Sequence, residues 1–459
     1  MTRRLSVTAA ERDLTNGPVF RQMVLFALPH MLTSALQIAY SAVDLAIVGH
    51  AVSGAALSAV SVSGHVLNLV TMLGLGFSTG GQVYMAQLLG MDRRSECGRV
   101  TATLLTATSA VAIVLALICA VFNGPILRLM NTPAEAYDIA VQYLVIGSAG
   151  LIFTFMYNGL AAIVRAFGDS QTPLYAILAA SAVNILLDLL FVVVFQWAVV
   201  GAILATVIGQ VLSALILLVA MLRGRERFGL DTSRENLRPN RSVLRSITFL
   251  AIPYALEMTV FNVSMLFISS MVNDVSLVAS ETFGIGLKVE EIGNKLCTGI
   301  TCATSVMVAQ SIASGNIERT KKIVHAAWIF GGCMYLLFGL LCFTMSKQLF
   351  SLFVDDAAVI ANAPMFIKAL SFGFPAMASM RATNGLMQGV SNAKLSLIIG
   401  VLDGIAVRIP LSYMLGIILG YGLWGFFLAY SLAAYTNALL GIGYYLSGRW
   451  KHRRLAAQQ

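Results

Sequence analysis

The feature that most constrains this chain is a series of apolar blocks, each about 20 to 30 residues long, separated by short polar connections. A helix of that length crosses about 30 Å of hydrocarbon and satisfies its own backbone hydrogen bonds there. Charged residues make up 11% of the 459 residues, which is too little polar surface for a soluble globule. The pattern therefore predicts an all-α membrane protein.

The blocks predict twelve transmembrane helices, and no signal-peptide pattern precedes the first block, so we expect the first helix to be retained. The predicted spans lie at about 20–48, 55–88, 98–122, 137–166, 174–197, 199–222, 246–272, 278–311, 322–346, 360–390, 394–417 and 421–446.

The formal net charge of +9 is compatible with nucleic-acid binding, but the positions of the basic residues favour another explanation. Lys and Arg gather in alternate connections, for example Arg93 and Arg94 after the second block, and Arg319 and Lys321 after the eighth. Connections of this kind stay in the cytoplasm. We expect a multi-pass protein of a bacterial cytoplasmic (inner) membrane with both termini cytoplasmic, surrounded by lipid and without a nucleic-acid partner.

An internal repeat is visible in the sequence. The matching pairs are LFALP ending at Pro29 with FLAIP ending at Pro253, MAQ from Met85 with VAQ from Val308, and VVGAILAT around Gly201 with LWGFFLAY around Gly425. The first and third pairs are 224 residues apart and the second 223. Chance similarity between apolar helices would not keep one offset across whole halves.

The repeat predicts two six-helix bundles related by pseudo-twofold symmetry along the membrane normal. The predicted domains are an N-terminal lobe at 1–222, a cytoplasmic basic linker at 223–245, and a C-terminal lobe with a basic tail at 246–459. Two bundles that rock about a central cavity suit alternating access.

Three acidic residues lie inside apolar spans, namely Asp44, Asp188 and Glu257. A carboxylate at mid-bilayer costs about 2.5 to 3.5 kcal/mol on insertion scales. Their combined cost, about 8 kcal/mol, rivals the net stability of a whole domain. We therefore expect these acids to have a partner, a cavity or a function.

Polar residues in the first half recur at a spacing of four, which puts both members of a pair on one helix face. The pairs are Tyr40 with Asp44, Asn184 with Asp188, and Ala202 with Thr206, and Asn158 adds an amide. No Lys or Arg lies near these acids in their spans. Two such carboxylates can bind a mobile cation or share protons. A polar network that only joins the helices remains the alternative.

Charged residues in the second half favour a structural role. Glu290 and Glu291 share a span with Lys288 and Lys295, which predicts a network of salt bridges. Asp403 and Arg408 can offset each other's burial. Glu257 follows Pro253 by one turn, and both a structural and a functional role stay open for it.

The sequence favours neither a cofactor nor an enzyme. The six cysteines show no CxxC spacing, and the histidines show no ligand spacing. Paired-histidine and HExxH motifs are also missing from the sequence. The only metal that we expect is Na⁺, for which Asp44, Asn184, Asp188 and Thr206 offer hard oxygen ligands.

Several longer motifs carry a family resemblance. They are FALPHMLTSALQIAYSAVDLAIVGH, NGLAAIVRAFGDSQTPL, NILLDLLFVVVF with VVGAILAT, and IPYALEM in the second half. From about residue 20 to 446 the chain resembles the multidrug and toxic compound extrusion (MATE) transporters of prokaryotes, in a superfamily that includes lipid-intermediate flippases. The resemblance implies a V-shaped pair of lobes and efflux of cationic or amphipathic small molecules in antiport with Na⁺ or H⁺.

The resemblance also implies site residues. In one branch of the family the coupling site matches Asp44, Asn184, Asp188, Thr206 and the carbonyl of Ala202, with Tyr40 and Asn158 nearby. Another branch uses a glutamate that Glu257 matches, together with an acid in span ten, where this chain has Met377 and Ala378. We expect a monomeric antiporter. A flippase or exporter of a lipid-linked or amphipathic metabolite is the alternative, in which Arg381, Lys288 and Lys295 would bind a phosphate headgroup.

Overall fold

The structure is a computed structural model that describes residues 14–51, 54–228 and 238–458; within these ranges, the side chains at 45, 46 and 48–51 are outside the description. Eleven helices in the described ranges are long and apolar enough to cross a membrane. A bent pair, Ala357–Ser371 with Phe374–Gly389 at 51°, makes up to twelve spans when it is counted as one. The predicted all-α fold is confirmed, and the long helices follow the predicted order.

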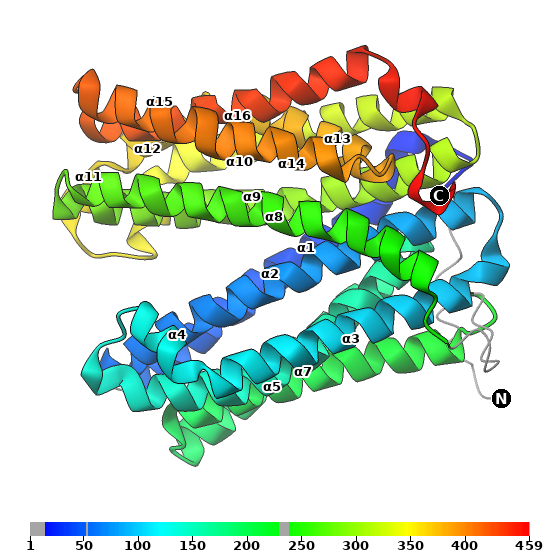
Figure 1. Cartoon of the computed structure of the whole chain (residues 1–459). Helices are drawn as coiled ribbons and strands as arrows, with labels where there is room; N and C mark the ends of the chain where they lie inside the picture. Colours follow the sequence, from blue (N-terminus) through cyan, green and yellow to red (C-terminus); the bar gives the residue numbers. More distant parts are fainter. Residues whose placement is uncertain (1–13, 52–53, 229–237, 459) are drawn as a thin grey trace, which may run out of the picture. The chain divides into compact units, whose positions relative to one another are not determined.

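The chain divides into two compact units. The first unit comprises Leu32–Thr248 together with Met1–Gly17, of which residues 14–17 are described. Its long helices run side by side (Figure 1). Its elements, in chain order, are α1 (Val19–Ala51), of which it holds the second part, α2 (Gly54–Gly90), η1 (Arg94–Glu96), α3 (Cys97–Val121), α4 (Asn123–Leu129), α5 (Ala134–Ala166), α6 (Gln171–Asp188), η2 (Leu189–Val194) and α7 (Ala198–Arg223).

The second unit comprises Pro18–Met31 and Phe249–Gln459. Its elements are the first part of α1, then α8 (Arg241–Asn273), of which it holds the part from Phe249 on, α9 (Leu277–Ala313), α10 (Ile317–Ser351), α11 (Ala357–Ala361), α12 (Ala363–Ser371), α13 (Phe374–Gly389), α14 (Ala393–Val401), η3 (Leu402–Arg408), α15 (Ile409–Tyr413), η4 (Met414–Ile418), α16 (Gly422–Leu446), η5 (Arg449–His452) and η6 (Ala456–Gln458). The span 393–418 thus contains two π-helical stretches, η3 and η4.

The first part of α1 belongs with the second unit, which differs from a division of the chain near residue 222. The physical reason is close packing against α9 and α10. A Cβ on Gly299 would lie 2.7 Å from Met31 Cγ and 2.8 Å from the carbonyl oxygen of Ala27, so only glycine lets α1 approach here. Phe20 also packs edge-on against Phe330, with ring centroids 6.2 Å apart.

Helix α8 begins at Arg241, five residues before the predicted start of the seventh span. The side chain of Asn240 accepts hydrogen bonds from the backbone N–H groups of Ser242 at 2.8 Å and Val243 at 3.2 Å. These bonds satisfy N–H groups that a helix leaves free at its start. Residues 229–237 of the predicted linker lie outside the described residues.

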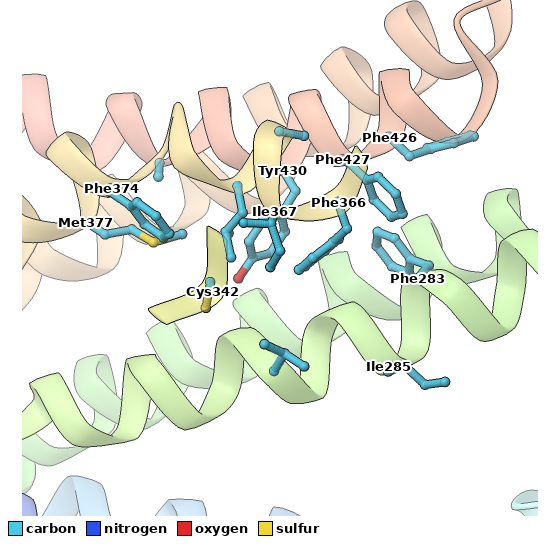
Figure 2. Close-up of a cluster of buried hydrophobic side chains, with 14 of the residues drawn as sticks. Phe283, Ile285, Cys342, Phe366, Ile367, Phe374, Met377, Phe426, Phe427 and Tyr430 are labelled. Carbon is cyan, nitrogen blue, oxygen red and sulfur yellow. The ribbon is translucent and has the colours of Figure 1, made fainter. Parts of the chain in front are cut away.

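The core of the second unit is a cluster of aromatic and aliphatic side chains from α9, α12, α13 and α16 (Figure 2). Phe366 packs edge-on against Phe427 at 4.9 Å between ring centroids, and Phe283 stacks on Phe427 at 5.9 Å. Met377 and Tyr430 belong to the same cluster. Helices α9 and α13, which carry Glu290 and Arg381, are therefore packed against this apolar core.

The two units share unusual backbone features at matching positions. The π-helical segment η2 at Leu189–Val194 has its counterpart in η4 at Met414–Ile418, at the repeat offset of 224 within one residue. Left-handed φ values also match. Gln196 (56°) and Ala198 (49°) correspond to Gly420 (69°) and Gly422 (54°). The repeat predicted from sequence is thus visible in local backbone geometry.

Candidate functional site

Asp44 on α1 and Asp188 at the end of α6 come together in the first unit. Their carboxyl groups lie within hydrogen-bonding range of each other. Asp188 is fully buried and Asp44 is half-buried. Asp188 directly precedes η2, and π-helical turns inside α-helices occur frequently at functional sites.

The two acids lack donors among the described residues. Oδ1 of Asp44 and both carboxyl oxygens of Asp188 are buried, and no described group donates a hydrogen bond to them. Two ionised carboxylates cannot hydrogen-bond, because each offers only acceptors. An arrangement of this kind is stable when a proton is shared or when a cation lies between the oxygens.

Asn184 lies one turn before Asp188 and is 3% exposed. Its side-chain oxygen and nitrogen are both buried without a described hydrogen-bond partner. Buried amides are normally hydrogen-bonded, so this carboxamide is available to a ligand. Helix α7 lies close by, since a Cβ on Gly209 would lie 3.4 Å from Asn184 Cβ.

Thr206 and Ala202 on α7 are bonded to each other, because Thr206 Oγ1 donates to the carbonyl oxygen of Ala202 at 3.1 Å. Thr206 is half-buried. The hydroxyl oxygen keeps its acceptor lone pairs, so it can still face a cation. For Asn158 on α5, no described hydrogen bond connects it to either acid.

Two tyrosines interact electrostatically with the acid pair, and the sequence predicted only Tyr40. The described structure adds Tyr143 on α5, which is 8% exposed and interacts electrostatically with Asp44, Asp188 and Tyr40. Tyr157, also on α5, interacts with Tyr40, and its buried hydroxyl has no described partner. No motif marks Tyr143. Its only sequence signal is a hydroxyl inside a span of mostly apolar residues.

Glu257 lies in the second unit and has its own neighbours there. It packs against α14, where a Cβ on Gly400 would lie 2.8 Å from Glu257 Cγ, and it interacts electrostatically with Asp403. Asp403 forms a salt bridge with Arg408 at 2.9 Å, so the predicted pairing of these two residues is confirmed. Met377 and Ala378 are buried in the apolar cluster, so their positions in span ten offer no acid to Glu257.

The predicted salt-bridge network on α9 is half right. Glu291 pairs with Lys295 at 2.7 Å. Glu290 is buried and instead hydrogen-bonds to Tyr430, with Arg381 and Arg408 near it. The prediction failed for Glu290 because adjacent residues on a helix point in different directions, so only one of two neighbouring acids can face the same lysine.

Each basic residue that a flippase would use for a phosphate headgroup has a local partner. Arg381 Nε donates to Tyr335 Oη at 3.3 Å, Lys295 pairs with Glu291, and Lys288 lies 5.8 Å from the ring centroid of Phe353. Within the described part of the chain, no group of three or more His, Cys, Asp and Glu side chains is arranged to hold a metal ion. A cation at the acid pair would therefore have two carboxylates and otherwise neutral ligands.

Comparison with known proteins identifies the family of the chain. The MatE family model matches residues 29–190 and 253–414, and the two matched segments start 224 residues apart, as the repeat does. The chain belongs to the MatE family. The first match ends at residue 190, two residues after Asp188, so the acid pair lies within the part that defines the family.

Similar proteins cover nearly the whole chain. The probable multidrug resistance protein YpnP of Bacillus subtilis is 27% identical over 447 residues, covering 97% of this chain and 99% of that protein. YoeA of the same organism, also described as a probable multidrug resistance protein, is 25% identical, covering 95% of both chains. The multidrug export protein MepA of Staphylococcus aureus is 22% identical, covering 92% of this chain and 94% of that protein.

Solved structures share the fold. An outward-facing structure of a multidrug resistance MATE family transporter matches with a TM-score of 0.88 and 20% identity, covering 95% of this chain and 98% of that one. A MOP superfamily transporter from Pyrococcus furiosus matches with a TM-score of 0.87 and 20% identity, covering 95% and 97%. The chain is thus a multi-pass membrane transporter of the MATE multidrug efflux family, and not an enzyme.

Proposed function

We propose that this transporter exports cationic or amphipathic small molecules across a bacterial cytoplasmic membrane in exchange for Na⁺ or H⁺. The observation that carries the proposal is the pair of carboxyls at Asp44 and Asp188, which face each other without a described donor or fixed cation. The names of the relatives, which include multidrug resistance and multidrug export proteins, support the substrate class.

In the proposed cycle, the coupling ion enters between Asp44 and Asp188, with Asn184, Thr206 and the carbonyl of Ala202 as neutral ligands. Binding neutralises the negative charge that would otherwise attract a cationic substrate. Coupling ion and substrate then exclude each other, so each ion that enters allows one substrate to leave. No cofactor takes part, and one chain suffices because both acids belong to one unit.

The test uses the purified chain in liposomes, with ethidium as a cationic amphipathic probe and an imposed Na⁺ or pH gradient. Asp44→Asn and Asp188→Asn should each reduce gradient-driven ethidium transport by about 100-fold, the upper end of typical coupling strengths. Asp138→Asn is a matched control, because Asp138 is an exposed acid on α5. Undiminished exchange by both acid-pair variants would overturn the proposal.

The same preparation separates the two candidate ions and a carrier from a channel. Transport that follows the Na⁺ gradient at constant pH identifies Na⁺, and transport that follows the pH gradient without Na⁺ identifies H⁺. Movement of ethidium against its own gradient requires coupled exchange. Ethidium that only equilibrates across the membrane, whatever gradient is imposed, would indicate a passive pore instead.

A further inference from the structure

In the second unit, the guanidinium group of Arg408 lies in a cage of acidic and aromatic side chains. Arg408 is 3% exposed, and its Nη2 donates to Asp403 at 3.1 Å (Oδ1) and 2.9 Å (Oδ2). The guanidinium carbon lies 5.0 Å from the ring centroid of Phe261 and 4.9 Å from that of Tyr430. The carboxyl group of Glu290, which hydrogen-bonds to Tyr430, also interacts electrostatically with Arg408. Carboxylates and aromatic rings are the groups with which proteins bind organic cations.

The local backbone makes the cage possible. Asp403 and Arg408 are five residues apart, which in an α-helix would turn their side chains about 140° away from each other. They lie instead in the π-helical segment η3, whose wider turn brings residues five apart onto one face. Pro410 follows directly and has no N–H group for the carbonyl of Ala406, which weakens α-helical bonding at this place.

Helix α8 supplies the second wall of the cage. It lies close to η3 at Gly404, where a Cβ would lie 3.1 Å from Val260 Cγ1 and 3.5 Å from Ser264 Oγ. Phe261, which follows Val260 in α8, contacts the guanidinium from this side. On the other side, Arg408 Nη1 donates to the carbonyl oxygen of Tyr430 at 3.3 Å.

The repeat relates this cage to the acid pair of the first unit. At the offset of 224, Asn184 corresponds to Arg408, Asp188 to Ser412 and Thr206 to Tyr430. The positions that offer an amide, a carboxylate and a hydroxyl in the first unit thus hold a guanidinium, a serine and a tyrosine in the second, and the tyrosine ring contacts the guanidinium. The matching π-helical segments η2 and η4 show that the register is the same in both.

We propose that Arg408 is a tethered cation, which fills from within the chain the place that corresponds to the coupling-ion site of the first unit. The cage of Asp403, Phe261 and Tyr430 is a receptor for a planar monovalent organic cation, with Arg408 as its permanent occupant. Exchange of a mobile cation is then confined to the first unit. This last step rests on the proposed function, whereas the cage can be tested without any transport measurement.

The test is rescue of a vacated cage by methylguanidinium. Arg408→Ala in the full chain removes the guanidinium and leaves its cage, so the melting temperature should fall and millimolar methylguanidinium should raise it again in a saturable way. The wild type should show no such rise, because its cage is filled. The double variant Arg408→Ala with Asp403→Asn is the matched control and should not respond, and KCl at equal concentration controls for ionic strength.

Two results would overturn the tethered cation. One is the absence of a saturable rise in Arg408→Ala, and the other is an equal rise in the double variant. If Arg408→Ala does not accumulate, Arg408→Lys and Arg408→Gln replace it. The lysine variant keeps a tethered charge and should accumulate several-fold better than the glutamine variant, and equal accumulation of both would also overturn the proposal.

The methylguanidinium test of the cage and the exchange test of the acid pair can fail independently of each other. Loss of exchange in Asp44→Asn together with no methylguanidinium response in Arg408→Ala would refute the tethered cation and leave the acid pair as the coupling site. A methylguanidinium response together with intact exchange in Asp44→Asn and Asp188→Asn would support the cage and refute the coupling site in the first unit.

Discussion

In the first unit, Asp44 and Asp188 face each other without a fixed cation among the described residues, whereas in the second unit Asp403 is bound by Arg408 and Glu290 lies near two arginines. Both units bury carboxyl groups among apolar helices, although the π-helical segment η3 that carries Asp403 and Arg408 corresponds to regular α-helix in α6. On the proposed function, a mobile ion balances the charge in the first unit, whereas Arg408 balances that of Asp403 permanently in the second. A repeated fold can therefore carry an unpaired acidic site in one half and a permanent ion pair in the other, with the same overall architecture.

The sharpest way to break this comparison is to neutralise one acid in each unit and compare stabilities. Asp403→Asn leaves the buried guanidinium of Arg408 without its acid, so it should destabilise the protein by about 3 to 5 kcal/mol. Asp188→Asn removes a buried charge that has no fixed cationic partner among the described residues, so it should be neutral or stabilising. The measurement is equilibrium unfolding in detergent, followed by tryptophan fluorescence.

The double variant Asp403→Asn with Arg408→Gln is the control, because it replaces the pair by neutral groups and should recover most of the lost stability. Equal destabilisation by Asp188→Asn and Asp403→Asn would show that both acids are structural. The two units would then not differ in how far their buried acids contribute to the free energy of unfolding.

A second test concerns the glycines that pack the last helix of each unit against a π-helical segment. A Cβ on Gly425 would lie 2.4 Å from the carbonyl oxygen of Leu415, and a Cβ on Gly201 would lie 2.9 Å from Phe191 Cβ. Gly425→Ala and Gly201→Ala should each destabilise by about 1 to 3 kcal/mol, with the larger effect at Gly425, where the contact is backbone. Gly332→Ala is the control, since nothing lies within 4 Å of its Cβ.

A third test sharpens the description of the acid pair. Tyr143→Phe removes a hydroxyl that interacts with both carboxyls, so we expect the affinity for the coupling ion to change by about tenfold, or about 1.4 kcal/mol. Ion-dependent ethidium exchange measures the effect, and Tyr175→Phe, at an exposed position on α6, is the control. An unchanged ion affinity would make Tyr143 a packing residue only.

The smallest effect is expected in the left-handed turns. Gln196 and Ala198 adopt φ values of 56° and 49°, which side chains with a Cβ disfavour, whereas the second unit has Gly420 and Gly422 there. Gln196→Gly and Ala198→Gly should each stabilise the first unit by about 0.5 to 1 kcal/mol, and Gly420→Gln and Gly422→Ala should destabilise the second by a similar amount. Thermal unfolding distinguishes these signs, and a uniform sign in all four variants would contradict the expectation.

The spans and the repeat could be predicted from the sequence because both depend on local composition and on one constant offset. The partnership of Asp44 and Asp188 was accessible for a similar reason, since acids in apolar spans are rare and require an explanation. Their role as a coupling site stays a prediction. The charges of Asp403 and Arg408 indicated a pair, although a spacing of five would not bring them together in a regular α-helix.

Other features depend on tertiary contacts that no single-sequence pattern records. Tyr143 looks like an ordinary residue of an apolar helix, and only the packing of α5 brings it near the acids. Glu290 and Glu291 look equivalent in sequence, and the rotation of α9 separates their partners. The π-helical segment η3 brings Asp403 and Arg408 together, and its only sequence signal is Pro410 shortly after it, which does not by itself specify a π-helical turn.

The left-handed turns shared by the two units have one more consequence. Gln196 and Ala198 keep the backbone shape of their glycine counterparts although their side chains differ, so the hand of the turn was kept while its residues changed. We therefore expect the two turns to be exchangeable between the units. A chimera in which residues 195–198 are exchanged for residues 419–422 should insert and fold, which offers a route to graft segments of one half onto the other.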